Sequence, residues 1–398
     1  MIGRGLGVSY DTINSMNYIG SKRRLLQDIS TVLSDCDLEY GLALDLFAGT
    51  GVVSGLLKKM GFRVFANDWQ SYSYSLVLSQ IGLNDFPTFD RLFLNSEWAP
   101  VLTAYPRTGC AFRGKSRDLH ACEGPFQQVI HYLQGLSDAQ GLFWDAYCEG
   151  GSQNRQYFSS ENGAKIQAIR DQIQDWFGAG LLCNDAYHWL LACVIESADQ
   201  VANTASVYGS YLKQVKASAR RPFVLHAVVP VPSNAKGQVS HQVFCDEGLR
   251  LLDQQKSAMS DWELTYLDPP YNQRQYSANY HVLETIAKWD LSSFRPRGIT
   301  GLRPGQEKMS YFCKKRRYLT AFQHLFDAIE SRYILFSYNS EGLLSDTEIE
   351  SLFAPTYQIV QFQRKPYQRF KSDQVSAQRA YKENRLCEYL VLGQRKFD

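Results

Sequence analysis

One short loop carries the residue types best suited to chemistry on an amino group. Asp268, Pro269, Pro270 and Tyr271 directly follow the apolar run 264–267, which has the character of a buried strand. The Asp268 carboxylate and the Pro269 carbonyl offer two acceptors for the hydrogens of an exocyclic amine, and Tyr271 offers a π-face on which a flat ring stacks. The two prolines fix the loop without adding donors. The alternative interpretation is an ordinary turn after a strand.

A second motif has the form of a strand, a tight glycine turn and a helix. Residues 42–47 are a short apolar run without polar alternation, as expected for a strand buried on both faces. The glycine turn 48–51 follows, and residues 52–60 carry apolar side chains on one helical face. Residues 62–67 predict a second strand that ends at Asp68. This βαβ unit predicts a nucleotide-type cofactor site, with the acidic residue placed to reach a ribose hydroxyl.

Strands and helices alternate in much of the remaining chain. Further strands are predicted at 242–245, 264–267, 333–338, 357–360 and 388–392, and a helix at 318–330. This alternation predicts an α/β fold with an open, doubly wound, mostly parallel sheet that binds ligands at the carboxyl ends of its strands. Asp45, Asp68, Asp246 and Asp268 fall at or near such ends. One or two of them are explained equally well as helix caps, whereas the four together favour a shared site.

The middle of the chain departs from this alternation. Periodicity is poor from about residue 95 to 154, which predicts an insertion, and helical patterns return at 164–176 and 186–201. Residues 222–234 contain three prolines and predict an extended connection back to the sheet.

This pattern predicts one catalytic domain divided by an insertion. Its first half is expected at residues 1–94 and its second half, with the catalytic loop, at 236–398. The inserted region is expected at 95–235.

Composition limits the class of protein. The 398 residues are 44% hydrophobic and 21% charged, as in soluble globular proteins, and no apolar stretch approaches the roughly 20 residues that span a bilayer. No basic region followed by an apolar one marks residues 1–14 for secretion, so we expect a cytoplasmic protein. The nine cysteines include Cys183 and Cys193 in apolar runs and predict reduced interior thiols. Cys110, His120 and Cys122 lack a second close pair, so no metal site is expected.

The formal net charge of +2 argues against binding nucleic acid by bulk electrostatics. Basic clusters occur at 22–24, 220–221, 314–317 and 364–371, several of them interleaved with aromatic residues. Together they fit a surface that neutralises phosphates, although each cluster alone is also typical of a solvated face.

Three motifs and their order resemble the S-adenosylmethionine-dependent DNA adenine methyltransferases of the Dam-like alpha class. Residues 17–23 resemble the amino-terminal motif of that class, 45–51 its cofactor loop and 268–271 its catalytic loop. Residues 202–205 with 208–213, and 271–276 with 279–281, resemble stretches of restriction-modification adenine methyltransferases. The likeness is weakest between about residues 95 and 150.

The resemblance implies a seven-stranded Rossmann-like methyltransferase sheet with an inserted, partly helical target-recognition region that binds DNA. It implies methyl transfer from S-adenosylmethionine to the N6 amine of a flipped adenine in double-stranded DNA, in a restriction-modification or phage-defence setting. A cognate restriction endonuclease is a partner that the resemblance suggests. We expect a monomer or weak dimer without membrane attachment.

The resemblance also implies roles for individual residues. Cofactor contacts are implied for Tyr18, Gly20, Lys22, Asp45, Phe47, Gly49, Gly51, Asp68 and Asp246. Lys22 would hold the methionine carboxylate, Asp45 the methionine amine, and Asp246 the adenine amine of the cofactor. The alternatives are a solvated basic run for Lys22 and a helix cap for Asp246. Phosphate contact or insertion into the base stack is implied for Lys213, Arg274, Tyr276 and Asn279, with backbone support around the catalytic loop as the alternative.

Such a reaction needs orientation and no covalent nucleophile, because the methyl group of a sulfonium is already electrophilic. Asp268 and the Pro269 carbonyl would localise the lone pair of the amine, and Tyr271 would stack on the extruded base. One rival acceptor is the cytosine amine, and enzymes that methylate it more often carry Ser at the position of Asp268. Another is RNA or a protein glutamine, and enzymes that methylate these more often carry Asn at that position. A non-catalytic DNA-binding protein with the same fold is a third alternative.

Overall fold

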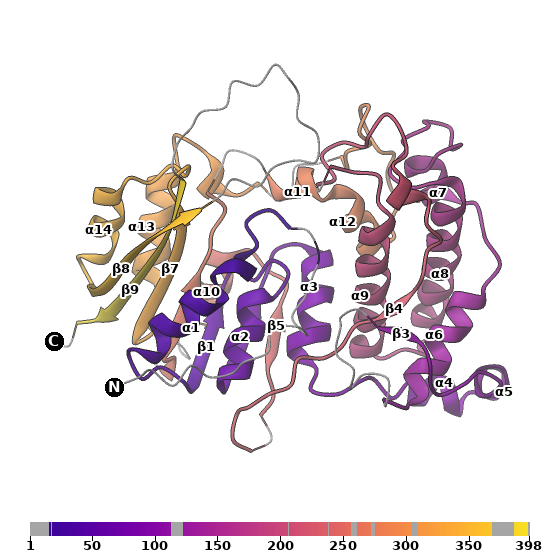
Figure 1. Ribbon diagram of the computed structural model, residues 1–398, viewed down its shortest axis with the longest axis horizontal. Coiled ribbons are helices and arrows are strands. Elements are labelled where there is room, and N and C mark those ends of the chain that lie inside the picture. The colour runs from indigo at the N-terminus through magenta and orange to yellow at the C-terminus, as the bar shows by residue number, and fades with distance from the viewer. Residues whose placement is uncertain are drawn as a thin grey trace.

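The computed structural model describes residues 16, 18–112, 122–205, 207–237, 239–255, 261–271, 275–304, 309–367 and 386–396. Within these ranges the chain forms one seven-stranded sheet with helices on both faces, and a helical region beside it (Figure 1). No helix in these ranges is long and apolar enough to cross a membrane.

The sheet confirms the predicted α/β, doubly wound, mostly parallel fold. Its strands, in spatial order, are β5 (Gln242–Phe244), β2 (Phe62–Asn67), β1 (Gly41–Asp45), β6 (Leu264–Leu267), β7 (Tyr333–Asn339), β9 (Leu386–Arg395) and β8 (Tyr357–Tyr367). The first five are parallel, and β9 runs antiparallel to β7 and β8. Chain order reverses between β1 and β6, which makes this the switch point where such sheets bind ligands.

Two hydrophobic clusters cover the two faces of the sheet. On one face, α1 (Leu26–Ser34) and α2 (Val52–Met60) pack against β1, β2 and β6. On the other face lie α10 (Gly248–Gln255), α13 (Tyr318–Ala328) and α14 (Asp346–Phe353). The central strands are buried on both sides, which explains why apolar runs in the sequence predicted them well.

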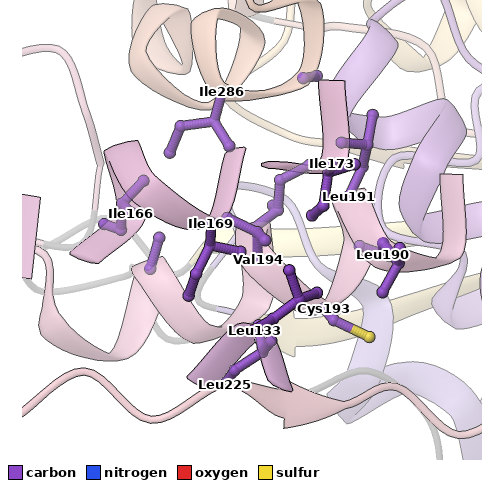
Figure 2. Close-up of a cluster of buried hydrophobic side chains, with 14 of the residues drawn as sticks. Leu133, Ile166, Ile169, Ile173, Leu190, Leu191, Cys193, Val194, Leu225 and Ile286 are labelled. Atoms are coloured by element: carbon purple, nitrogen blue, oxygen red, sulfur yellow. The ribbon is translucent and has the colours of Figure 1, made fainter. Parts of the chain in front are cut away.

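The helical region has a core of its own. It contains α4 (Asp90–Leu94), α5 (Trp98–Thr103), α6 (Pro125–Gly135), α7 (Leu142–Tyr147), α8 (Ser160–Gly178), α9 (Asn184–Val201) and the parallel pair β3 (Ala111–Phe112) and β4 (His226–Ala227). Helices α3 (Ser71–Val77) and α12 (His281–Lys288) also contribute to this core. Figure 2 shows Ile169 of α8, Val194 of α9 and Ile286 of α12 in one cluster. The helical core therefore includes elements on both sides of residues 95–235.

Helices α5, α6 and α7 lie where periodicity is poor, and buried glutamines of α6 and α8 accept hydrogen bonds from backbone amides in this region. Gln127 Oε1 accepts from Cys110 N at 2.9 Å, and Gln167 Oε1 accepts from Phe143 N at 3.0 Å. Cys193 is buried as expected, but the expectation of an interior Cys183 is wrong. That thiol is exposed at the start of α9, where it accepts from the Ala186 amide.

Candidate active site

A pocket of about 940 Å³, its open mouth included, lies at the carboxyl ends of β1, β2 and β6. The predicted site residues that line it are Tyr18, Gly20, Lys22, Asp45, Phe47, Gly49, Asp68, Asp246, Asp268, Pro270 and Tyr276. Residues far apart in the sequence thus share one cavity because three parallel strands end at the same edge.

Asp45 ends β1 as a buried carboxylate with one unused oxygen. Its Oδ2 accepts from Ser54 Oγ at 2.6 Å, while Oδ1 is buried without a hydrogen-bond partner among the described residues. Burial raises the pKa of Asp45 to about 7, and the nearby carboxylates of Asp268 and Asp68 act in the same direction. A cationic ligand group beside Oδ1 would supply the missing partner.

The glycine turn is fixed by Asp68. Gly49 N donates to Asp68 Oδ2 at 2.9 Å, and Gln70 N donates to Oδ1 at 2.8 Å. Gly49 has φ +54°, and a Cβ on it would lie 2.9 Å from Tyr18 Cε1. Gly51, at φ +78°, precedes α2. The turn therefore needs glycine both for its backbone conformation and for the approach of an aromatic ring.

Tyrosine side chains hold the amino-terminal motif against α11 (Tyr276–Asn279). The Tyr18 ring stacks on Tyr280 with centroids 4.8 Å apart. Ile19 N donates to Tyr280 Oη at 2.8 Å, and Tyr276 Oη donates to Ile19 O at 3.3 Å. Tyr276 thus lines the pocket and supports its wall.

Lys22 joins the amino-terminal motif to the catalytic loop. Its side chain is 3% exposed, and Nζ lies 3.0 Å from Asp268 Oδ1 and 3.6 Å from Glu388 Oε2. Burial raises the pKa of Asp268 to about 6, although Lys22 lowers it. The two carboxylates raise the pKa of Lys22, so this ammonium stays charged despite its burial. The interpretation of 22–24 as a solvated basic run is wrong at Lys22, whereas Arg23 and Arg24 are exposed.

The rest of the catalytic loop packs tightly behind the carboxylate. Pro269 is buried and Pro270 faces the pocket. The Tyr271 ring is buried, 5.7 Å from Lys22 Nζ, and meets Tyr338 edge to face with centroids 6.1 Å apart.

Asp246 follows β5 at the far end of the pocket. Its Oδ1 accepts from Glu247 N at 2.6 Å and from Arg250 Nε at 2.5 Å. Asn67 fixes the backbone here, since its Oδ1 accepts from Asp246 N at 3.1 Å. The carboxylate lies beside the start of α10 and is also open to the pocket.

The residues predicted to contact DNA are spread over several segments, unlike the predicted cofactor contacts. Asn279 is half-buried in α11, and a Cβ on Gly209 would lie 3.4 Å from its Oδ1. Lys213 is exposed on the loop that follows Gly209, and Arg274 lies outside the described residues. Among the basic clusters, Arg220 pairs with Glu149 and Arg364 with Asp346.

Sequence reasoning missed several residues of this site. Glu388 lies in β9 beside Lys22. The sequence marks it only as a charged residue at the start of an otherwise apolar predicted strand. Gln275 and Ser310 line the pocket and pair with each other, with Ser310 N donating to Gln275 Oε1 at 2.9 Å. Phe312 also lines it and meets Phe47 edge to face. No local pattern marks these three residues.

The described residues contain no cluster of three or more His, Cys, Asp or Glu side chains that could hold a metal ion. Of the three residues considered as metal ligands, Cys110 is buried and Cys122 is partly buried, and His120 lies outside the described residues.

Comparison with known proteins identifies the chemistry. The model of the D12 class N6 adenine-specific DNA methyltransferases matches residues 18–351. The chain is 37% identical to the type II methyltransferase M.NlaIII of Neisseria lactamica over 388 residues, which cover 96% of this chain and 100% of that protein.

Two longer relatives are matched over part of their length. Identity is 32% over 366 residues with M.FokI of Planomicrobium okeanokoites, covering 90% of this chain and 50% of that protein. The identity is 29% over 387 residues with the modification methylase StsI of Streptococcus sanguinis, and the match covers 96% of this chain and 52% of that protein. The chain thus spans about half of these two. No solved structure matches it.

These matches favour adenine over the cytosine alternative and catalysis over a non-catalytic role. The substrate is DNA, and the reaction requires a methyl donor. The chain belongs to the D12 class N6 adenine-specific DNA methyltransferases.

Proposed function

We propose that the pocket binds S-adenosylmethionine and presents it to an adenine turned out of double-stranded DNA. The buried, unpartnered Asp45 Oδ1 supports this, because the methionine end of that cofactor carries an ammonium group. Acidic residues at successive strand ends also fit a ligand with amine and ribose groups.

Cofactor roles are proposed by position along the pocket. Asp45 would hold the ammonium group, Asp68 the ribose hydroxyls and Asp246 the adenine amine. Lys22 and the backbone at Gly20 would hold the methionine carboxylate. Gly49 and Gly51 would allow the backbone to pass close to the cofactor. Of the two, Gly49 lines the pocket, with Tyr18 and Phe47 as apolar walls. The bound cofactor would supply an electrophilic methyl group.

The catalytic loop would act on the adenine. The Asp268 carboxylate and the Pro269 carbonyl would accept the two amine hydrogens and direct the nitrogen lone pair towards the methyl group. Tyr271 would stack on the base, which requires its ring to present a face to the substrate. Pro270 would pack beside it.

DNA recognition is proposed for the inserted region 95–235 and the rim of the pocket. Lys213, Arg274, Tyr276 and Asn279 would contact phosphates or the disturbed base stack. Relatives named as type II methyltransferases support a restriction-modification setting. A cytoplasmic location, a cognate endonuclease as partner and a monomeric or weakly dimeric methyltransferase are part of the same proposal.

One observation carries this proposal: Asp268 and Pro270 line the same pocket as Asp45 and Asp68. The test is transfer of labelled methyl from S-adenosylmethionine to unmethylated bacterial DNA, followed by digestion to nucleosides. N6-methyl-2′-deoxyadenosine in the digest is the expected result. Cofactor binding without any labelled nucleoside would contradict the proposed reaction.

A further inference from the structure

Residues 297–302 form a hairpin with an apolar tip, and we propose that Ile299 at this tip enters the DNA base stack where the target adenine leaves it. This inference rests on the proposed function, because only base flipping opens a gap in the stack. It assigns a further DNA-contacting element, separate in sequence from the catalytic loop and from the proposed contacts at the rim of the pocket.

The exposure of Ile299 has no explanation in the packing of the protein. Its side chain is 84% exposed at the tip of a tight turn. Arg297 N donates to Leu302 O at 2.7 Å, and Leu302 N donates to Arg297 O at 2.8 Å. Gly298 and Gly301 adopt φ of +68° and +72°, which close the turn. The chain thus builds a defined turn that presents an aliphatic side chain to solvent.

Buried side chains hold the backbone of this turn from below. Arg155 is buried, and it donates from Nε to Ile299 O at 3.2 Å and from Nη2 to Gly298 O at 3.0 Å. Tyr147 Oη donates to Gly301 O at 2.9 Å, and Tyr157 Oη donates to Thr300 O at 2.9 Å.

Each of the four carbonyls from 298 to 301 therefore has a partner. A tip held in this way inserts into a ligand with little further loss of conformational entropy. Ordinary surface loops are more mobile than this, so the rigid support of the turn fits a side chain that must hold its position inside a ligand.

Close polar contacts connect the hairpin to the rim of the pocket. Tyr157 Oη lies 3.1 Å from Tyr208 O, and Tyr208 N donates to Asn279 O at 2.8 Å. Asn279 ends α11, which begins at the pocket residue Tyr276. In Figure 1 the orange segment after α12 rises at the same edge of the molecule as α11. The hairpin is thus connected to the helix whose first residue lines the pocket.

The charge around the tip favours DNA over a protein partner. Arg295 and Arg297 are exposed beside Ile299, and residues 291–304 include no Asp or Glu. Cations that contact phosphates on both sides of an inserted Ile, Leu or Phe are typical of proteins that wedge into DNA. A protein-binding surface would need a larger apolar patch than one residue with its half-exposed neighbour Leu302.

The experiment compares Ile299→Ala with Leu94→Ala on two duplexes. Leu94 is 85% exposed in α4, so it is a matched change at a site without the proposed role. Mapping of adenines methylated by the wild type first supplies the target sequence. One duplex then has the target adenine paired, and the other has it opposite an abasic site, where no pairing energy must be overcome.

We expect Ile299→Ala to lower kcat/KM on the paired duplex by about tenfold or more, since unstacking costs a few kcal/mol. Activity on the unpaired duplex should return to nearly the wild-type value, and Leu94→Ala should match the wild type on both. Equal activity of Ile299→Ala and wild type on the paired duplex would overturn the inference. So would an equal loss on both duplexes, which would indicate a contact unrelated to flipping. Failure of the wild type to methylate any DNA would instead overturn the proposed function, and this inference with it.

Discussion

The Lys22 ammonium lies 3.0 Å from Asp268 Oδ1, so a residue of the amino-terminal motif touches the carboxylate of the catalytic loop directly. Glu388 contacts the same ammonium from β9 at 3.6 Å. One buried cation therefore serves two carboxylates, and it links three segments that are far apart in the sequence.

Replacing Lys22 by Met should destabilise the fold strongly. The change leaves two carboxylates facing each other in a buried site, and breaking a buried pair in this way costs about 3–5 kcal/mol. The measurement is urea unfolding of Lys22→Met, with Lys365→Met as control because the Lys365–Asp28 pair is partly exposed. The control should lose about 1 kcal/mol or less. Similar losses in the two variants would contradict a buried cation shared by two carboxylates.

Glu388→Gln should shift the acid limb of the kcat profile to lower pH. Asp268 must be ionised to accept amine hydrogens, so activity should rise with pH through about 6, the pKa that Asp268 has beside Glu388. Because Glu388 raises that pKa, its neutralisation lets Asp268 ionise at lower pH. Glu263→Gln, at an ion pair with Arg332 just before the amino ends of β6 and β7, is the control and should leave the limb in place. An unchanged limb in Glu388→Gln would show that Glu388 does not act on Asp268.

Asp45→Asn should make the protein more stable at pH 8 while weakening cofactor binding. The folded-state pKa of Asp45 is raised from 3.8 to about 7, so its stabilising contribution is complete below about pH 4 and is lost as pH rises through 7. The variant has no charge to bury above pH 7, and the expected gain is on the order of a few kcal/mol. Thermal unfolding at pH 5 and pH 8 checks this. If the stability of the variant depended on pH as that of the wild type does, Asp45 would not be the cause of the loss of stability above pH 7.

Gly49→Ala should reduce cofactor affinity with little effect on DNA binding. The new Cβ would lie 2.9 Å from the Tyr18 ring, at a φ of +54° that side chains rarely adopt. Gly178→Ala is the matched control, since a Cβ there meets nothing within 4 Å. Calorimetric titration with S-adenosylmethionine measures the effect. Equal affinity in both variants would show that the turn tolerates a side chain.

Much of the catalytic sheet could be predicted because its residues obey local rules. Strands β1, β2 and β6 are mostly apolar, and an acidic residue stands at the carboxyl end of each or directly after it. The burial of Lys22 could not be predicted in this way, because it depends on Glu388, a strand partner more than 300 residues away. Glu284 is a similar case: it accepts from the amides of Ser71 and Tyr72 at the start of α3, a cap supplied by another helix.

Tyr271→Ala should slow methyl transfer more than Tyr271→Phe, because the proposed role needs an aromatic ring and no hydroxyl. The Tyr271 ring also packs on Tyr338, so unfolding curves of both variants must accompany the kinetics. Single-turnover rates at saturating DNA are the appropriate measurement. Equal loss in the two variants at equal stability would contradict stacking and implicate the hydroxyl.

The most direct test compares Asp268→Ala with the wild type in two assays on the same samples: binding of S-adenosylmethionine, and transfer of its labelled methyl group to unmethylated DNA with identification of the nucleoside. The account predicts N6-methyl-2′-deoxyadenosine from the wild type alone, with cofactor affinity in the variant largely retained. Normal turnover by Asp268→Ala would contradict the central role of this carboxylate.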